Sequence, residues 1–194
     1  MGITARPSNP ALLAARTAML VVRDDIVKQW ARWVNERIAT APGLDAATLE
    51  RQFGLLFDIL VEFAGPLRRQ GAELWFTACD AYGRLAAVRG LAAGEVVEEI
   101  QHLRELLIRH LSEAVFSLPT RQTMAVVLRL NRTLDKGIAH AVVGYTDTLV
   151  ETLLDRRGIP IAANEPAEAA MTERISHLED ELAQLRVNTA GLSP

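Results

Sequence analysis

The sequence of 194 residues has one cysteine, few aromatic residues and little net charge. The lone cysteine excludes a small scaffold held together by disulfide bonds and suits a reducing compartment. A net charge of −3 excludes the strongly basic composition of many nucleic-acid-binding proteins. Because 49% of the residues are hydrophobic, a disordered chain is excluded as well. We therefore expect a folded, helix-rich, cytoplasmic protein with one domain and an appendage.

Long hydrophobic runs are also missing. The apolar run at residues 11–22 is interrupted by Arg16 and is followed by Arg23, Asp24 and Asp25. A membrane-spanning helix needs about 20 predominantly apolar residues, so this run is too short. No small-residue cleavage site follows it, which argues against a signal peptide. We expect neither a membrane span nor contact with a membrane.

Apolar residues recur at three- and four-residue steps along the chain, which is the spacing of amphipathic helices. Glycine and proline interrupt this pattern at Pro42-Gly43, Gly65-Pro66, Gly90, Pro119 and Gly158-Ile159-Pro160. No segment shows the alternation of a β-hairpin. The pattern predicts an all-α fold, an antiparallel helical bundle of about five helices followed by a C-terminal coiled-coil-like helix.

The same pattern divides the chain into segments. We expect a flexible N-terminus, a helical bundle, a linker with small residues and prolines, a coiled-coil-like helix and a flexible tail. Their predicted bounds are residues 1–9, 10–157, 158–166, 167–187 and 188–194. The C-terminal part is acidic, because residues 162–194 hold six acidic side chains against two arginines.

The last predicted helix has the heptad pattern of a coiled coil. In a parallel pair of chains, Arg174 would face Glu179 of the other chain, and Glu181 would face Arg186. The end of the preceding helix is apolar on more than one side, so it also needs a second packing partner. We predict a homodimer with the interface residues Leu149, Leu153, Ile175, Leu178, Leu182 and Leu185. The alternative is an amphipathic helix that docks on its own bundle.

Eight of the ten aromatic residues lie between Trp30 and Tyr82. The simplest interpretation is that their rings fill the core of the bundle. A second interpretation is an apolar sensory pocket among the first three helices. The residues of this candidate pocket are Trp30, Trp33, Phe53, Phe57, Trp75, Phe76 and Tyr82.

No segment carries a strong catalytic motif, and we expect no enzymatic activity. Glu99 and His102 form half of the motif of di-iron bundles, but no second copy occurs, so we predict no metal and no cofactor. His102 and His110 leave a globin-like sensor with a bound cofactor as an alternative. His140, which stands near Lys136 on the long helix, is a candidate phosphoacceptor of a histidine phosphotransfer protein.

Three segments carry a resemblance to a known family. Residues 82–91 and 95–104 resemble helix junctions in the N-terminal sensory domain of the RsbT co-antagonist family, and residues 134–142 resemble its final long helix. Trp30 and Trp33 are similar to the tryptophan-bearing start of that domain. The resemblance spans about residues 15–157.

This resemblance implies a helical input module that dimerises and passes a signal to a C-terminal output such as a STAS domain. Only 37 residues follow position 157, too few for that output. We therefore expect a non-enzymatic signalling module with a protein partner and no nucleic acid. It is either a stand-alone sensor or adaptor, or a fragment of a longer protein.

The predicted pairing is open to a direct test. Replacement of Leu178 and Leu182 by charged residues is expected to weaken the homodimer, because both positions lie in the predicted seam. Light scattering at high protein concentration measures the effect. A chain that is strictly monomeric with or without residues 167–194 would contradict the pairing.

Overall fold

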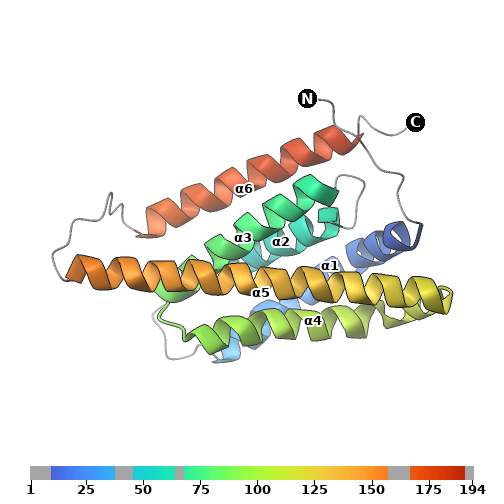
Figure 1. Ribbon diagram of the computed structural model, residues 1–194, viewed down its shortest axis with the longest axis horizontal. Helices are drawn as coiled ribbons and strands as arrows, with labels where there is room; N and C mark the ends of the chain where they lie inside the picture. Colours follow the sequence, from blue (N-terminus) through green and yellow to red (C-terminus); the bar gives the residue numbers. More distant parts are fainter. Residues whose placement is uncertain (1–9, 38–45, 64–67, 157–166, 191–194) are drawn as a thin grey trace.

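The computed structural model describes residues 10–37, 46–63, 68–156 and 167–190. These residues form six α-helices and no strand, which confirms the all-α prediction (Figure 1). The helices are α1 (Pro10–Arg37), α2 (Ala46–Phe63), α3 (Arg68–Val88), α4 (Ala93–Phe116), α5 (Thr120–Arg156) and α6 (Ala167–Ala190). Among the helices described, none is long and apolar enough to span a bilayer.

The predicted segment bounds can be compared with these helices only in part. The predicted N-terminus (1–9) and linker (158–166) lie outside the described residues, as do residues 191–194 of the predicted tail. The last helix continues to Ala190, three residues beyond its expected end.

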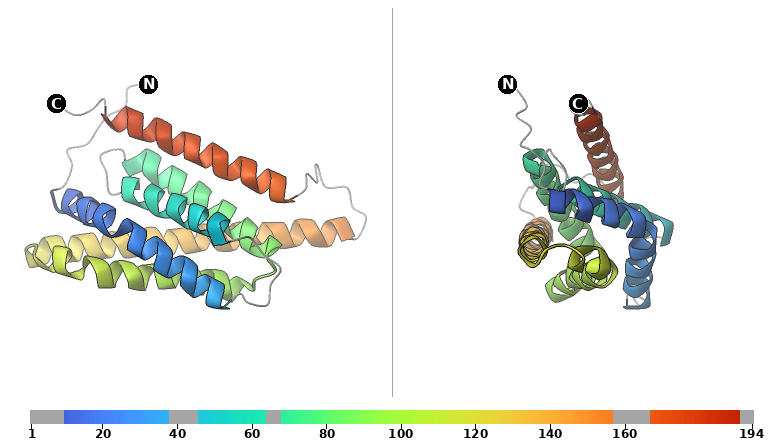
Figure 2. Two further views of the ribbon diagram at one scale, coloured as in Figure 1. Left: turned by 180° about the vertical axis from the view of Figure 1, so that it is seen from behind. Right: turned by 90° about the vertical axis from the view of Figure 1, so that its right-hand side faces the viewer.

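α5 runs along the whole molecule, and the preceding helix α4 lies antiparallel beside it (Figures 1 and 2). α3 has its most extensive contact with α5, and α1 packs on α2 and α4. α6 lies over α2 and α3 on another side of the molecule, and within the described residues it contacts neither α4 nor α5. The bundle therefore separates α6 from the hairpin of α4 and α5.

The contact between α3 and α5 is a backbone-to-backbone approach that requires glycine. A Cβ atom at Gly83 would overlap the backbone of Ala141, and one at Gly144 would overlap the backbone of Asp80. Gly137 is similarly covered by the indole of Trp75. These glycines lower the intrinsic stability of their helices, but they allow the two helices to meet more closely than side chains would permit.

Glycine also ends α3. Gly90 has a φ of +76°, which is in the left-handed region that glycine adopts without strain. The N–H groups of Gly90 and Leu91 donate to the carbonyls of Ala87 and Ala86, at 3.0 and 3.1 Å, which is the Schellman pattern of a helix C-terminus. In the first turn of α4, the carboxylate of Glu95 accepts a hydrogen bond of 2.6 Å from the backbone N–H of Ala92.

Substitution of Gly83 by alanine is expected to destabilise the fold by about 2 kcal/mol or more, because the new methyl group must push α3 away from α5. Gly94 in α4 is a matched control, since nothing lies within 4 Å of a Cβ atom built there. Gly94→Ala is expected to leave stability unchanged or to raise it by up to about 1 kcal/mol. Chemical unfolding followed by circular dichroism measures both changes. Equal stability of the two variants would refute the close packing.

Candidate functional site

The apolar stripe of α6 is covered by the bundle of its own chain. Ile175, Leu178, Leu182 and Leu185 are each at most 7% exposed, and α6 packs on α2 and α3. The structure thus shows the docking that the sequence left as the alternative to pairing between chains. Pairing through this stripe stays a prediction, and it requires α6 to leave this face.

The other two predicted interface residues lie elsewhere. Leu149 and Leu153, near the end of α5, are 41% and 57% exposed. Val150 between them is also exposed, so this part of α5 presents an apolar surface. The structure does not bring these residues together with the stripe of α6, because α5 and α6 have no contact within the described ranges.

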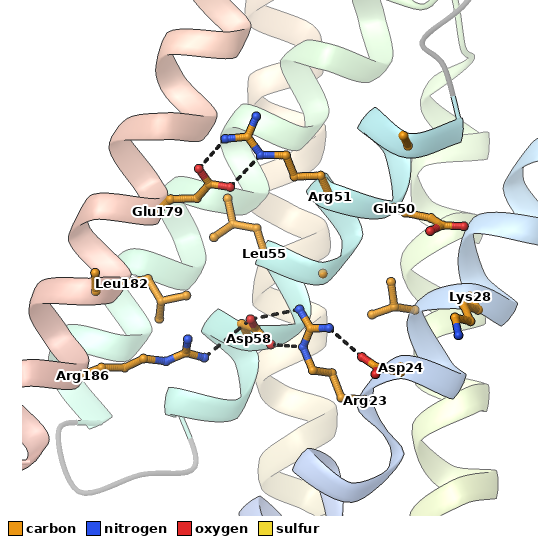
Figure 3. A pocket seen from close by; sticks show the side chains of 14 residues that line it. Arg23, Asp24, Lys28, Glu50, Arg51, Leu55, Asp58, Glu179, Leu182 and Arg186 are labelled. Carbon is orange, nitrogen blue, oxygen red and sulfur yellow. Dashed lines mark hydrogen bonds and ion pairs between the residues drawn. The ribbon is translucent and has the colours of Figure 1, made fainter.

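A groove of about 740 Å³ is lined by residues of α1, α2 and α6 (Figure 3). Its apolar part includes Val27, Leu55 and Leu182. The charged residues that line it are Arg23, Asp24 and Lys28 of α1, Glu50, Arg51 and Asp58 of α2, and Glu179 and Arg186 of α6. Because these acids and bases balance, most of their charge is already neutralised by neighbours.

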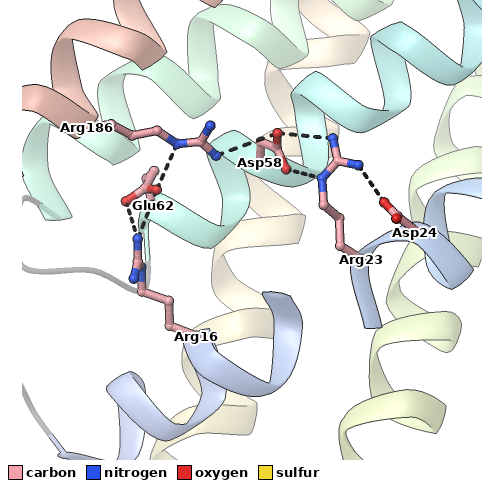
Figure 4. A network of polar contacts seen from close by, with 6 residues as sticks. All are labelled: Arg16, Arg23, Asp24, Asp58, Glu62 and Arg186. Atoms are coloured by element: carbon pink, nitrogen blue, oxygen red, sulfur yellow. Dashed lines mark hydrogen bonds and ion pairs between the residues drawn. The ribbon is translucent and has the colours of Figure 1, made fainter. Parts of the chain in front are cut away.

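Arg186 of α6 reaches two carboxylates of α2 (Figure 4). Its Nε lies 3.2 Å from Glu62 Oε1, and its Nη2 lies 3.6 Å from Asp58 Oδ2. Glu62 is only 3% exposed and also accepts both hydrogen bonds of 3.1 Å from Arg16 Nη2. Asp58 is shared with Arg23 of α1, so these five side chains join three helices. A buried carboxylate between two guanidinium groups is a paired charge, which offsets its desolvation.

A second link between α2 and α6 is bidentate. Arg51 Nε donates to Glu179 Oε1 at 2.8 Å, and Arg51 Nη2 donates to Glu179 Oε2 at 2.5 Å. The hydrogen bonds from Arg51 lower the pKa of Glu179, and those to Glu179 raise the pKa of Arg51. Both side chains are partly exposed, so the pair contributes at most about 1 kcal/mol. Docking of α6 thus depends mainly on its apolar stripe, while the ion pairs set its position.

The third link joins α6 to α3 and, through α3, to α5. Arg174 Nη2 lies 3.9 Å from Asp80 Oδ2, which also accepts a hydrogen bond of 3.0 Å from Arg84 Nε. Arg84 in turn reaches Asp147 and Glu151 of α5, at 3.2 and 3.4 Å. Asp80 also lies at Gly144, where α3 and α5 meet. The ion pairs of α6 therefore extend, through Asp80 and Arg84, to the close crossing of α3 and α5.

The predicted aromatic pocket is for the most part packed core. Trp30 stacks on Phe53 with centroids 4.0 Å apart, and Tyr82 lies 6.0 Å from Phe53. Trp30, Phe53, Phe57, Trp75 and Tyr82 are all at most 1% exposed. A ligand among these rings stays a prediction.

The other two aromatic candidates lie at the edge of the core. Trp33 stacks on His102 at 4.4 Å, and Phe76 stacks on His140 at 4.6 Å. Phe76 also lines a cleft of about 540 Å³ with Phe63 of α2. His140 is exposed, and histidine phosphotransfer through its ring stays a prediction. Gly144, one turn further along α5, packs against the backbone of Asp80 on α3.

A buried polar cluster lies beneath the junction of α3 and α4. The hydroxyl of Tyr82 donates to Glu99 Oε2, and Arg89 Nη2 lies 3.7 Å from Glu99 Oε1. Burial raises the pKa of Glu99 to about 8 and lowers the pKa of Arg89 to about 10. The carboxylate of Glu99 therefore contacts Tyr82 and Arg89 of α3. His102, the other residue of the di-iron half-motif, stacks on Trp33. Within the described ranges, no three His, Cys, Asp or Glu residues gather in a possible metal site.

Sequence reasoning missed the ion pairs that hold α6. Their signal in the sequence is the spacing of Arg16 and Arg23 seven residues apart on α1, and of Asp58 and Glu62 four residues apart on α2. Such spacings place each pair on one helix face. These spacings do not say which face of which helix the arginines or the carboxylates will contact, because that depends on how the helices pack.

The class of protein follows from a comparison with known families. Residues 24–158 match the family described as RsbT co-antagonist protein rsbRD N-terminal domain. The chain belongs to this family, as its resemblance indicated, and its matched part is a signalling-related domain. No curated protein and no solved structure matched. The match begins after Arg16 and Arg23 and ends before α6, so the docked helix and the two α1 arginines that share its carboxylate partners on α2 lie outside it.

The buried cluster generates a pH prediction. Since the pKa of Glu99 is raised from 4.5 to about 8, the folded state keeps a proton that the unfolded state has released. The free energy of unfolding should thus fall as pH rises from about 5 to 8, by at most about 1.4 kcal/mol per pH unit, and level off above pH 8. Glu99→Gln is expected to flatten this decrease, whereas Glu113→Gln, an exposed control on α4, should keep it. Urea unfolding at each pH tests this, and a parallel decrease in all three proteins would contradict it.

Proposed function

We propose that this chain is a non-enzymatic signalling module of the cytoplasm whose output is the state of α6, docked on its bundle or paired with a second chain. The family places the bundle among signalling domains. The observation that carries the proposal is that docking already occupies the side chains that pairing would need.

The overlap concerns both kinds of contact. The apolar residues Ile175, Leu178, Leu182 and Leu185 form the predicted seam of the dimer and are buried against α2 and α3. The charged residues Arg174, Glu179 and Arg186 are predicted to pair between chains and instead contact Asp80, Arg51 and Glu62 of the same chain. One stripe cannot face two partners at once, so the two states exclude each other.

The connection to the rest of the bundle runs through α3. Arg174 contacts Asp80, and Arg84 links Asp80 to Asp147 of α5. A ligand or protein partner that shifts α5 against α3 would disturb these contacts, because the backbones at Gly144 and Asp80 lie too close together to admit even a Cβ atom. In this proposal, the input at the bundle changes the free energy of docking and thereby the fraction of released α6.

The released state would be a parallel homodimer. The exposed apolar end of α5, with Leu149 and Leu153, would extend the interface that the released stripe of α6 forms. The paired form then presents two bundles to a signalling protein partner. Two heptads alone are marginal, so the balance between the states is sensitive to small changes in docking energy.

The test weakens docking without changing α6. Arg51→Gln combined with Asp58→Asn removes two partners of α6 on α2. We expect hydrogen exchange of residues 173–186 to rise about tenfold, since two partly exposed pairs contribute about 1.4 kcal/mol together. Light scattering should show more dimer at the same concentration. Arg69→Gln is the matched control, because Arg69 is exposed and pairs only with Glu73 of its own helix in the described part.

Two outcomes would contradict the proposal. In one, exchange of α6 is unchanged by the double substitution. In the other, α6 is released but self-association does not increase. The double substitution on α2 is expected to increase self-association. Charged residues at 178 and 182 are expected to decrease it, because they disrupt docking and pairing together. This opposition separates a switch from a simple loss of structure.

A further inference from the structure

The cleft of about 540 Å³ that contains Phe63 and Phe76 has one sign of charge, and we call it the basic cleft. Its charged lining residues are Arg129, Arg132 and Lys136, and no acidic residue among those described lines it. All three lie on α5, three and four residues apart, so they share one face of that helix. The acids and bases of the groove beside α6 balance, whereas the basic cleft has a formal charge of +3 in a chain whose total is −3.

The acidic residues adjacent in sequence to the lining residues do not neutralise this charge. Each of them pairs with an arginine that does not line the cleft: Glu62 with Arg16, Glu73 with Arg69, and Asp135 with Arg104. Within the described residues, neither Arg132 nor Lys136 forms an ion pair with a carboxylate. Both side chains are exposed, so an anion from solution can reach them.

The remaining surface of the cleft is apolar and aromatic. Phe63 of α2 and Phe76 of α3 line it, together with Leu128 of α5, which is 49% exposed. Arg129 Cζ lies 5.6 Å from the centroid of the Phe63 ring, and Lys136 Nζ lies 5.8 Å from the centroid of the Phe76 ring. Each ring is therefore close to a cation of α5, and a ligand that contacts the rings with an apolar body places a charged group near these cations.

Size and charge together favour a small ligand with one anionic group. A volume of 540 Å³ falls within the range of about 300–1,000 Å³ of small-molecule sites. The cations occupy residues 129–136, about 10 Å of helix, whereas a nucleic acid is bound through many phosphates along a longer basic surface. Arginine binds carboxylate and phosphate groups alike. We therefore propose that the basic cleft binds a small amphipathic anion, with an apolar body on the rings and a carboxylate or phosphate group on the cations of α5.

The position of the cleft connects this ligand to the bundle. Trp75, next to Phe76 on α3, donates a hydrogen bond of 3.0 Å from Nε1 to the carbonyl of Thr133 on α5. A ligand in the cleft contacts α3 and α5 on either side of this bond, so it changes the free energy of their packing. The proposal gives the chemical class of the ligand that acts on the bundle, and its effect on α6 rests on the proposed function.

The experiment is isothermal titration calorimetry of the full chain with decanoate and with decyl phosphate, each below its micelle concentration. Decyltrimethylammonium is a control with the same alkyl chain and the opposite charge, and acetate is a control with the charge but without the chain. We expect saturable binding of at least one of the two decyl anions, at least tenfold tighter than binding of either control. Affinity should fall as the salt concentration is raised, since charges contribute. The ratio of the two anion affinities identifies the preferred anionic group.

Two variants locate the binding. Arg132→Gln combined with Lys136→Gln should weaken it at least tenfold, and both side chains are exposed, so the fold is retained. Arg109→Gln combined with Arg121→Gln is the matched control, because it removes the same charge from exposed residues outside the cleft. Its affinity should equal that of the unmodified chain. Circular dichroism verifies that all three proteins are folded.

Three results would overturn the proposal. These are no binding of either decyl anion, equal binding of the decyl anions and decyltrimethylammonium, and undiminished binding by the cleft variant. Binding of phosphatidylglycerol vesicles in the first case would assign the cleft to a membrane surface.

Hydrogen exchange of residues 173–186 in the same samples separates the cleft from the proposed switch. Anion binding that leaves this exchange unchanged would support the site and contradict its effect on α6. Absence of anion binding, together with release of α6 by the double substitution on α2, would overturn the site and support the switch.

Discussion

The close approach of α3 to α5 is the contact on which the rest of the structure depends. It exists because Gly83 and Gly144 have no side chain where the two backbones meet. α3 positioned in this way carries Tyr82 and Trp75 into the core, and it offers Asp80 to α6. A change of a few tenths of an ångström at this crossing would be transmitted to both sides of α3, because packed interiors do not absorb strain.

The face under α6 combines strong and weak forces in different roles. Burial of four apolar side chains provides most of the docking energy, and electrostatic screening by salt does not weaken it. The arginine–carboxylate pairs add little, but they require one register of α6 against α2 and α3. The apolar stripe thus fixes α6 to the bundle, and the ion pairs fix its position along α2 and α3.

The cluster of Tyr82, Glu99 and Arg89 has a different character. Its groups are buried near the end of α3, where Gly90 ends that helix, and burial acts against the charges of both Glu99 and Arg89. Such a cluster costs stability compared with apolar residues of the same size. It orients the junction of α3 and α4, from which the hairpin of α4 and α5 starts.

The sequence by itself determined the helices and their approximate bounds, because apolar periodicity and glycine or proline breakers are local signals. The family was indicated separately, by the resemblance of particular segments, and the family comparison matches it. It also showed that the stripe of Ile175 to Leu185 needs an apolar partner. Only the tertiary structure decided that the partner in this state is the chain's own α2 and α3, and that Gly144 packs on α3. An amphipathic pattern specifies that a face will be buried, but the surface that buries it depends on contacts between residues distant in sequence.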